Sequence, residues 1–315
     1  MSFPHKSVVV AIGISGAWLV AITMLVMPSK ATTGGTNGLL AYQAQVGKHT
    51  AASDIQLFTI KPDGTGEHQI TRFSNSDAIN PAWSPNGQRI AFARDYAFGT
   101  SQEHLDIVVI NANGSGMHAF HLHGLNAGPT WSPNGREIAW GTSGGFAIAN
   151  ANGSGLRRVK VKGFDGSPVF SPNGKLIAFR RQKGGESIYT IKPNGSGLTL
   201  VKAFAGGLGD KIDWSPDGSR IAYDTPEFSQ SPSSKPSNIF TIRTNGTGVR
   251  QLTHGTSGKV NYGLDSWSPD GKKIAFVSNL GGSTYEIYTM NANGHGIKQL
   301  VHGHEAHFAA WGTHP

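Results

Sequence analysis

Residues 83–92 read WSPNGQRIAF, and this stretch decides the fold because closely related stretches recur along the chain. Each copy has an aromatic residue, then Ser-Pro-Asn/Asp-Gly, then two residues and an Ile-Ala-aromatic triplet. The copies are spaced by ~40–50 residues, and repeats of that length with several short strands are typical of a β-propeller. Five complete copies and a truncated sixth begin at Trp83, Trp131, Phe170, Trp214, Trp267 and Trp311.

One repeat predicts the strands of one blade. After a short first strand, the Ser-Pro-Asn-Gly turn follows, with Gly87 able to adopt the positive φ that the turn needs. Residues 88–93 and 105–111 are rich in β-branched and aromatic residues and predict the second and third strands. A second turn at residues 112–116 leads to a fourth strand at 117–122. The second turn occurs six times, so we predict an all-β, six-bladed β-propeller of four-stranded antiparallel blades. Its glycines are Gly64, Gly114, Gly153, Gly195, Gly246 and Gly294.

The two ends of the repeat region predict how the propeller closes. Residues 39–42 are similar to the second strand of a blade that lacks its first strand, and residues 307–311 are similar to a first strand without its successor. We therefore expect the N- and C-terminal strands to complete the last blade, which removes open sheet edges. Each repeated aromatic should pack between adjacent blades, where burying ~150–250 Å² at ~25 cal/mol per Å² contributes ~4–6 kcal/mol before costs.

The N-terminus carries a separate signal. Residues 7–27 form an uncharged apolar run, and at ~1.5 Å per residue one apolar helix here reaches ~30 Å, the thickness of a bilayer core. A retained membrane anchor and a cleaved signal peptide both fit, because Ser29-Lys30-Ala31 offers a cleavage site. Either interpretation places the rest of the chain outside the cytoplasm. We expect an N-terminal membrane or signal segment at 1–30, a linker at 31–37 and the propeller at 38–315.

The composition limits the chemistry. There is no Cys, which excludes disulfides, thiol catalysis, thiolate metal sites and a lipid-modified Cys. The formal net charge of +8 favours acidic partners or anionic surfaces. Residues 157–162 contain four basic side chains on an expected outermost strand, where Lys and Arg commonly block edge-to-edge pairing. No basic motif interleaved with aromatics is present, so we expect no nucleic-acid partner.

The phrases quoted above resemble a known repeat. An aromatic-Ser-Pro-Asn/Asp-Gly phrase, followed by Ile-Ala-aromatic, an Ile-Tyr strand and an Asn-Gly-Ser-Gly turn, is similar to the WD40-like repeat of TolB-type β-propellers. The resemblance covers roughly Gly38 to Pro315 and implies the six-bladed fold. TolB belongs to the periplasmic side of the Tol-Pal cell-envelope system, so an extracytoplasmic location is also implied. TolB has an α/β domain before its propeller, and the short stretch before Gly38 leaves no room for one. We therefore expect a TolB-like propeller and not TolB.

The connections between strands predict which face binds a partner. The Ser-Pro-Asn/Asp-Gly and Asn-Gly-Ser/Thr-Gly turns are the first and third connections of each blade and share one face, here called the turn face. The second connections and the crossovers between blades share the opposite face, here called the crossover face. Variable loops on a rigid scaffold commonly carry binding sites. The variable loops span residues 95–104, 225–237, 253–262 and 278–284.

Residues just before each repeated aromatic should surround the mouth of the central channel on the crossover face. Four of them are carboxylates, so the mouth could bind a cationic peptide segment, or a cation such as Ca²⁺ that bridges to one. The alternative is that these side chains cap turns and satisfy backbone groups of the crossovers. The candidate partner-binding residues are Asp77, Asn126, Asp165, Asp210, Asn261, Glu305 and His307.

Two motifs that suggest chemistry have structural explanations. Residues 141–145 (GTSGG) match the GxSxG nucleophile elbow, but an elbow needs a strand–turn–helix context, and this segment lies between two expected strands. Four Asn-Gly-Ser/Thr glycosylation sequons coincide with the repeated turns and need no attached sugar. These sequons begin at Asn113, Asn152, Asn194 and Asn245.

The histidines leave one alternative open. His121 with His123, and the three histidines of residues 302–307, have spacings that can bind a metal, but no helix sets their geometry and we expect no metal site. Glu305 with His304 or His307 could act as general acid and base in a propeller hydrolase or lyase.

The sequence favours a non-catalytic, extracytoplasmic binding or scaffold propeller that docks a protein or peptide on the crossover face and needs no cofactor. The alternatives are the hydrolase or lyase and a cell-surface ligand or glycan sensor.

Overall fold

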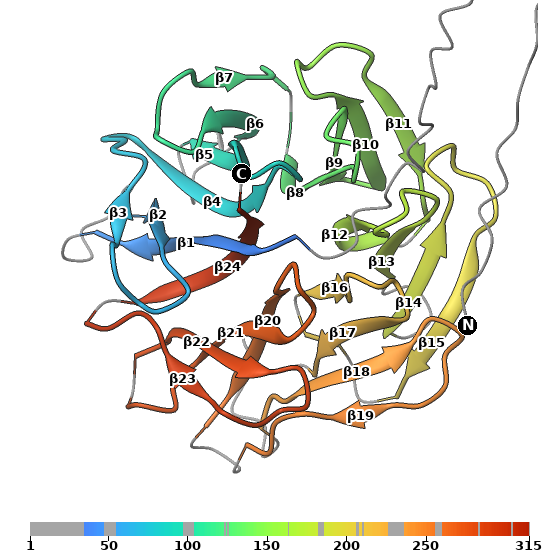
Figure 1. The fold of residues 1–315 in the computed structure, drawn as a ribbon. Coiled ribbons are helices and arrows are strands. Elements are labelled where there is room, and N and C mark those ends of the chain that lie inside the picture. The colour runs from blue at the N-terminus through green and yellow to red at the C-terminus, as the bar shows by residue number, and fades with distance from the viewer. Residues whose placement is uncertain are drawn as a thin grey trace, which may run out of the picture. The chain divides into compact units, whose positions relative to one another are not determined.

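The computed structural model describes most of the propeller region, and its strands form six four-stranded antiparallel sheets, which Figure 1 shows. The described residues are 35–46, 55–96, 104–122, 124, 126–162, 164–181, 186–205, 208–209, 211–225, 236–255, 260–282, 284–303 and 305–314, with the backbone alone at 164–167.

Each sheet is one blade. Blade 1 contains β4 (Ser76–Trp83), β5 (Arg89–Tyr96), β6 (His104–Asn111) and β7 (His118–Ala119). Blade 2 contains β8 (Asn126–Trp131), β9 (Glu137–Thr142), β10 (Gly145–Asn150) and β11 (Arg157–Lys160). Blade 3 contains β12 (Phe164–Phe170), β13 (Ile177–Arg181), β14 (Glu186–Ile191) and β15 (Thr199–Phe204). Blade 4 contains β16 (Ile212–Trp214), β17 (Arg220–Asp224), β18 (Ile239–Arg243) and β19 (Arg250–Gln251). Blade 5 contains β20 (Tyr262–Trp267), β21 (Lys273–Ser278), β22 (Glu286–Asn291) and β23 (Lys298–Gln299). Blade 6 contains β24 (Ala306–Thr313), β1 (Asn37–Gln45), β2 (Ile55–Ile60) and β3 (His68–Gln69).

The first strand of every blade belongs to a closed inner ring. In the order β4, β8, β12, β16, β20 and β24, each of these strands contacts the next, and β24 contacts β4 again. Figure 1 shows the six sheets arranged around a common centre. The six-bladed propeller predicted from the repeats is therefore confirmed.

The Ser-Pro-Asn/Asp-Gly turn is held by its own side chains. Ser84 Oγ donates to Asn86 Oδ1 (2.8 Å) and accepts the N–H of Arg89 (2.9 Å). Gly87 has a φ of 67°, a left-handed conformation that favours glycine. The Ser–Asn/Asp bond recurs in the turns of blades 2 to 5. The turn is therefore specified locally, which explains why the phrase is repeated so closely.

The second repeated turn has an equally local origin. Asn113 Oδ1 accepts the backbone N–H (3.0 Å) and the hydroxyl (2.7 Å) of Ser115. The turns of blades 2, 3 and 4 repeat both bonds, and Asp63 makes them to Thr65 in blade 6. These bonds give each sequon asparagine a structural role in its turn.

The repeated aromatics pack between blades, as predicted. Trp131 of blade 2 is 6% exposed and belongs to a buried cluster with Ala91 and Leu105 of blade 1. Its indole Nε1–H donates to the Ala82 carbonyl oxygen at 3.1 Å. This aromatic therefore connects two blades by apolar contact and by a hydrogen bond.

Blade 6 closes the propeller from both ends of the repeat region. β24 pairs with β1 from Asn37–Thr313 to Ala44–Ala306, and β1 continues into β2 and β3. The N–H of His314 donates to the carbonyl oxygen of Thr36 at 2.8 Å. The predicted closure by N- and C-terminal strands is confirmed.

The closure predicts a stability effect at Gly38. A side chain at this position would collide with the backbone carbonyl of Thr313 in the neighbouring strand. We expect Gly38→Val to lower the free energy of unfolding by roughly 2 kcal/mol, because β1 and β24 must separate to admit it. Gly282→Val is the control, because a Cβ there meets nothing within 4 Å. Equal urea midpoints for the two variants would contradict this account of the closure.

The predicted N-terminal segment lies outside the described residues, which begin at 35. Within the part of the chain that is described, no helix is long and apolar enough to cross a bilayer. The anchor or signal and the boundaries at 30 and 37 therefore stay predictions.

Candidate functional site

The predicted mouth residues all belong to the crossover ends of the innermost strands. In the sequence, each one lies at or just before the start of β4, β8, β12, β16, β20 or β24. Asp165 lies in β12, but its side chain is outside the described part, and Asp210 is outside it altogether. The other five side chains can be placed individually.

Two of these five are buried and engaged within the protein. Asp77 is 7% exposed, and its Oδ1 accepts the N–H of Ile55 at 3.0 Å. Asn126 is 1% exposed, and its Nδ2 donates to the carbonyl oxygens of Leu105 and Gly124, both at 2.9 Å. The Nε1–H of Trp140 donates to Asn126 Oδ1 at 3.0 Å. These bonds satisfy backbone and core groups, which is the alternative role that the sequence left open.

Asn261 joins two loops of the crossover face. Its Oδ1 accepts the N–H of Ser237 at 3.1 Å, and its own N–H donates to Asn279 Oδ1 at 2.8 Å. Its carbonyl oxygen accepts the hydroxyl of Ser278 at 2.7 Å. Asn261 therefore orders the loop before β18 and the loop after β21.

Glu305 and His307 form the solvent-facing part of the predicted site. His307 Nε2 lies 3.1 Å from Glu305 Oε1, and the side chains are 24% and 43% exposed. The His307 ring lies 5.7 Å from the Tyr285 ring and 6.3 Å from the Phe308 ring, measured between centroids. The pair therefore presents a carboxylate and an imidazole to solvent, and the Tyr285 and Phe308 rings lie beside the imidazole.

Three further charged residues lie at the innermost strands β16 and β20, and the sequence analysis did not predict them. They are Lys211 and Asp213 of blade 4 and Asp265 of blade 5, and we call them the inner cluster. Asp265 stands two residues before its repeated aromatic, and blades 1 to 3 have proline at that position. This departure from the repeat is the signal by which the sequence could have revealed the cluster. The three prolines are Pro81, Pro129 and Pro168.

One carboxylate oxygen of Asp265 has no donor in the described part of the chain. The residue is 3% exposed, and its carboxylate accepts the backbone N–H groups of Phe308 and Ala309. Its Oδ2 has no hydrogen-bond partner among the described residues. Burial raises the pKa of Asp265 to about 7, against the opposing effect of the Lys211 ammonium and the two N–H groups. A buried acceptor of this kind favours a donor or a cation supplied from outside.

Asp213 connects blades 4 and 5. Its Oδ2 accepts the N–H of Trp267 at 2.7 Å, and its Oδ1 accepts the N–H of Trp214 at 2.9 Å. Burial raises the pKa of Asp213 to about 6, although the N–H bonds and the Lys211 charge lower it. Asp213 Oδ2 therefore joins blade 4 to blade 5, whereas Oδ1 bonds within its own strand β16.

Lys211 is held by an aromatic ring. Its Nζ lies 5.2 Å from the Phe308 ring centroid, a distance suited to a cation–π interaction. Burial lowers the pKa of Lys211, and the carboxylates of Asp265, Asp213 and Asp224 oppose that effect. Since Lys211 makes no ion pair shorter than 4 Å with any described carboxylate, Asp265 Oδ2 keeps its capacity to bind another group.

Lys211 and Asp265 of the inner cluster line one cavity together with the predicted His307. Its volume is about 20 Å³, enough for one water molecule or one donor group. No group of three or more His, Asp or Glu suited to a metal ion occurs among the described residues. The lining residues are Lys211, Asp224, Gly263, Leu264, Asp265, Val277, His307 and Phe308.

The remaining sequence motifs fall outside this site. Thr142 at the end of β9 pairs with Gly145 at the start of β10, so the GTSGG segment is a two-residue hairpin and not a strand–turn–helix elbow. His121 and His302 are exposed, and the neighbouring His123 and His304 lie outside the described residues.

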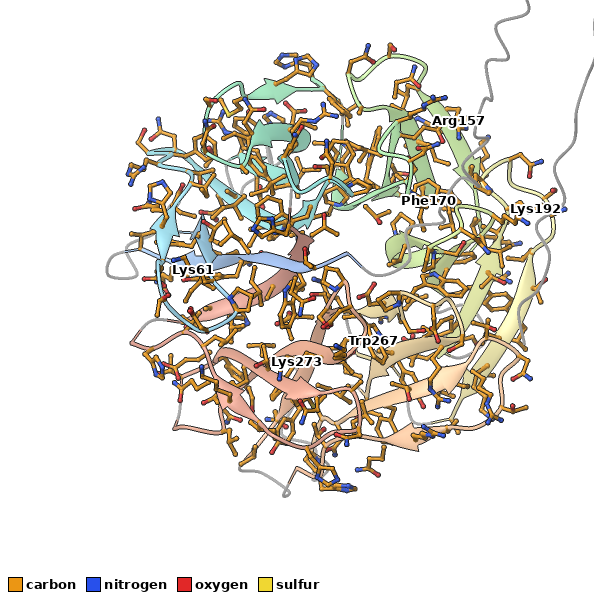
Figure 2. All side chains as sticks on the ribbon, in the orientation of Figure 1. Lys61, Arg157, Phe170, Lys192, Trp267 and Lys273 are labelled. Carbon is orange, nitrogen blue, oxygen red and sulfur yellow. The ribbon has the colours of Figure 1, made fainter. Side chains whose placement is uncertain are left out.

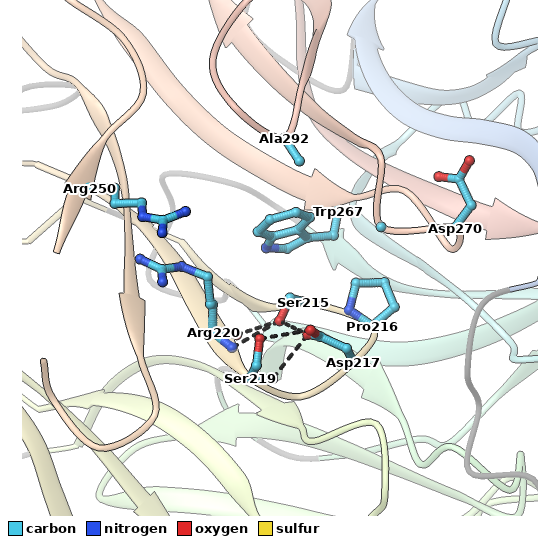
Figure 3. Close-up of a pocket in the computed structure, with 10 residues that line it drawn as sticks. Ser215, Pro216, Asp217, Ser219, Arg220, Arg250, Trp267, Asp270 and Ala292 are labelled. Atoms are coloured by element: carbon cyan, nitrogen blue, oxygen red, sulfur yellow. Dashed lines mark hydrogen bonds between the residues drawn. The ribbon is translucent and has the colours of Figure 1, made fainter. Parts of the chain in front are cut away.

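A larger pocket lies on the turn face between blades 4 and 5. Its volume is about 590 Å³, and Arg220, Arg250 and Trp267 line it together with residues of the two Ser-Pro-Asp-Gly turns. Figure 3 shows the guanidinium ends of Arg220 and Arg250 on the same side of the Trp267 ring. Burial and the charges of Arg250 and Arg243 lower the pKa of Arg220. No feature of the sequence had indicated this pocket.

The family of the chain follows from its repeats. A family model described as the TolB β-propeller domain matches residues 33–232. The chain belongs to the TolB β-propeller family. The resemblance of the repeats to TolB-type propellers is thus confirmed. No curated protein sequence matches this TolB-like propeller.

Solved structures of known proteins share its fold. TolB from Acinetobacter baumannii is 20% identical, with a TM-score of 0.70 over 87% of this chain and 66% of that one. A chain of the nidogen/laminin complex is 12% identical, with a TM-score of 0.64 over 87% of this chain and 98% of that one. Oligogalacturonate lyase from Vibrio parahaemolyticus is 12% identical, with a TM-score of 0.52 over 74% of this chain and 71% of that one. The TolB-like propeller spans about two thirds of Acinetobacter TolB, and identities this low show the fold alone.

Proposed function

We propose that this TolB-like propeller is a non-catalytic binding protein outside the cytoplasm that receives a basic segment of a protein or peptide on its crossover face. Its apolar N-terminal run and its family support the location. The nidogen/laminin complex contains a chain of the same fold, which supports a protein partner. The hydrolase or lyase alternative draws on the 3.1 Å contact between Glu305 and His307 and on the fold of the lyase.

One observation carries this proposal. Asp265 lines the cavity, and its Oδ2 has no donor among the described residues. The same cavity is lined by His307, which contacts the half-exposed Glu305. A Lys or Arg side chain entering past Glu305 would supply the missing donor to Asp265. The bound cation would also stabilise the ionised form of Asp265, so binding should strengthen as pH rises through about 7.

Site-specific photo-crosslinking in the cells that make the protein tests this proposal. A photoreactive residue at the exposed His302 reports on the crossover face, and one at the exposed His295 reports on the turn face. We expect one discrete partner captured from position 302, and a loss of most of that capture in Asp265→Asn and Glu305→Gln. Removing a charge-assisted hydrogen bond of this kind costs roughly tenfold in affinity or more.

The outcomes are distinguishable. Capture from position 302 that is unchanged by both carboxylate substitutions would contradict basic-segment binding at this site. Turnover of a substrate by the purified protein that disappears in His307→Ala would establish the enzyme alternative instead.

A further inference from the structure

Positive charge is concentrated on the turn face. Its turns and the strand residues directly beside them carry twelve Lys or Arg against five Asp or Glu, a net +7 compared with +8 for the whole chain. Figure 2 shows four of them, Lys61, Arg157, Lys192 and Lys273, spread around the propeller in different blades. The twelve are Lys61, Arg89, Arg136, Arg157, Lys175, Lys192, Arg220, Arg243, Arg250, Lys272, Lys273 and Lys298. The five are Asp63, Glu67, Glu137, Asp217 and Asp270.

The same face displays one exposed apolar side chain in each of five blades. The position is the residue directly after the Asn-Gly-Ser/Thr-Gly turn or its His-containing copy in blade 5, and Glu67 takes it in blade 6. These side chains are 39–48% exposed, and each of blades 1 to 5 contributes one of them. Single exposed apolar residues are common on protein surfaces, but five at the same position of five blades form a ring on the turn face. They are Met117, Leu156, Leu198, Val249 and Ile297.

The two arginines of the pocket between blades 4 and 5 form no ion pair with a described carboxylate, although Asp217 and Asp270 also line the pocket and the Asp217 charge acts on Arg220. In blade 2, Glu137 and Arg157 occupy the first residue of the second strand and the first residue of the fourth strand, and they form an ion pair at 2.7 Å. Blade 4 has Arg220 and Arg250 at the same two positions. Neither arginine has a carboxylate within 4 Å among the described residues. An external anion would supply the charge that Glu137 supplies in blade 2.

The described chain begins at this face. Asn37 Oδ1 accepts the N–H of Asp270, which lies in the Ser-Pro-Asp-Gly turn of blade 5. Seven residues, 28–34, separate the apolar run from the first described residue, and seven residues span at most about 25 Å. A membrane-inserted run that ends at Met27 would therefore keep the attachment point on the turn face within that distance of the bilayer.

From these observations we propose that the turn face docks on an anionic bilayer surface, with the ring of apolar side chains at the headgroup boundary and a lipid phosphate in the Arg220–Arg250 pocket. Basic side chains near an anionic leaflet attract it additively, and apolar side chains among them add shallow insertion. Docking there leaves the crossover face and its inner cavity open to a partner on the solvent side.

An extended planar surface fits these features better than an acidic protein does. A single protein partner covers about 800 Å² of one protein, whereas the basic and apolar positions are distributed over all the blades. An acidic protein would also gain little from apolar side chains that come one from each of five blades. A bilayer contacts the entire face at once and accepts each side chain separately.

Fluorescence quenching by brominated lipids tests the docking on the full chain. The protein has no Cys, so a bimane label can be placed at a single introduced Cys without background. Leu198→Cys reports on the turn face, and Leu280→Cys, at a position exposed to 41%, reports on the crossover face. An N-terminal anchor would tether both labelled proteins to vesicles alike, so the difference between labels shows which face meets the lipid.

We expect strong quenching at position 198 in vesicles containing phosphatidylglycerol, several-fold weaker quenching in phosphatidylcholine alone, and none at position 280. Salt near ~1 M, where the Debye length is ~3 Å, should remove most of the quenching at 198. The double substitution Arg220→Gln with Arg250→Gln should reduce it. The control, Glu137→Gln with Arg157→Gln, leaves the net charge unchanged and should have little effect.

Three results would overturn the proposal. Equal quenching at 198 and 280 would mean that no face is preferred, and quenching at 198 that ignores lipid charge would remove the electrostatic basis. A change in the bimane fluorescence at position 198 caused by soluble poly-glutamate, with no quenching by anionic vesicles, would indicate that the turn face binds an acidic protein and not a bilayer.

Discussion

We expect Trp131→Ala to lower the free energy of unfolding by about 3–5 kcal/mol, a large effect for a residue outside the proposed site. The indole is 6% exposed and packs against Ala91 and Leu105 of the preceding blade. Its Nε1–H also donates to the Ala82 carbonyl oxygen at 3.1 Å. Removing the indole therefore opens a cavity between two blades and breaks a hydrogen bond that joins them.

Urea unfolding followed by far-ultraviolet circular dichroism measures this effect without relying on tryptophan fluorescence. Trp131→Phe is the matched control, because it keeps most of the buried area and removes the N–H donor. We expect a loss of at most about 2 kcal/mol in this variant. If the two substitutions were equally harmful, packing between blades would not be the main contribution of Trp131.

We expect wild-type stability to fall between pH 4 and pH 8 relative to that of Asp265→Asn. Burial raises the pKa of Asp265 to about 7, whereas an unfolded Asp titrates near ~3.9. In this window the folded protein holds a proton that the unfolded chain has released, so the stability contributed by Asp265 is complete below pH ~4 and is lost as pH rises through about 7. The loss should approach roughly 4 kcal/mol by pH 8, because the folded and unfolded pKa values differ by about 3 units at ~1.4 kcal/mol each.

Paired urea titrations at pH 4, 6 and 8 test this prediction. The two proteins should be similarly stable at pH 4, where Asp265 is protonated when folded and about half protonated when unfolded. The variant should then become the more stable of the two as pH rises, since asparagine stays neutral. Asp213 adds a decline in both proteins, because its pKa is raised to about 6. Parallel curves from pH 4 to pH 8 would show that Asp265 is not buried as described.

Local sequence was sufficient for the blades. The turn after Trp83 is held by hydrogen bonds from the Ser84 hydroxyl to the Asn86 side chain and from the Arg89 N–H to the Ser84 hydroxyl. Because these bonds join residues close in sequence, the motif specifies the same turn geometry wherever it recurs. The strand pattern and the incomplete copies at both ends then determined six blades and their closure. The turn asparagine Asn113, with its bonds to Ser115, is local in the same way.

The candidate site was predicted only in part. The sequence placed Glu305 and His307 together, because they are two residues apart at the start of one innermost strand. It also placed Asp77 and Asn126 at strand ends, but it could not show that core and backbone donors already engage them. Burial depends on neighbours from other strands, which no short stretch of sequence contains.

The sequence by itself determined the repeat, the number of blades and the face on which each turn lies, because these depend on contacts within a few residues. Only the tertiary structure decided that Lys211, Asp265 and Phe308, which are far apart in the chain, surround one cavity. It alone also decided that Arg220 and Arg250 share a pocket. Contacts between residues so distant in sequence depend on how neighbouring blades pack, and that packing is determined by side chains from the whole closed propeller.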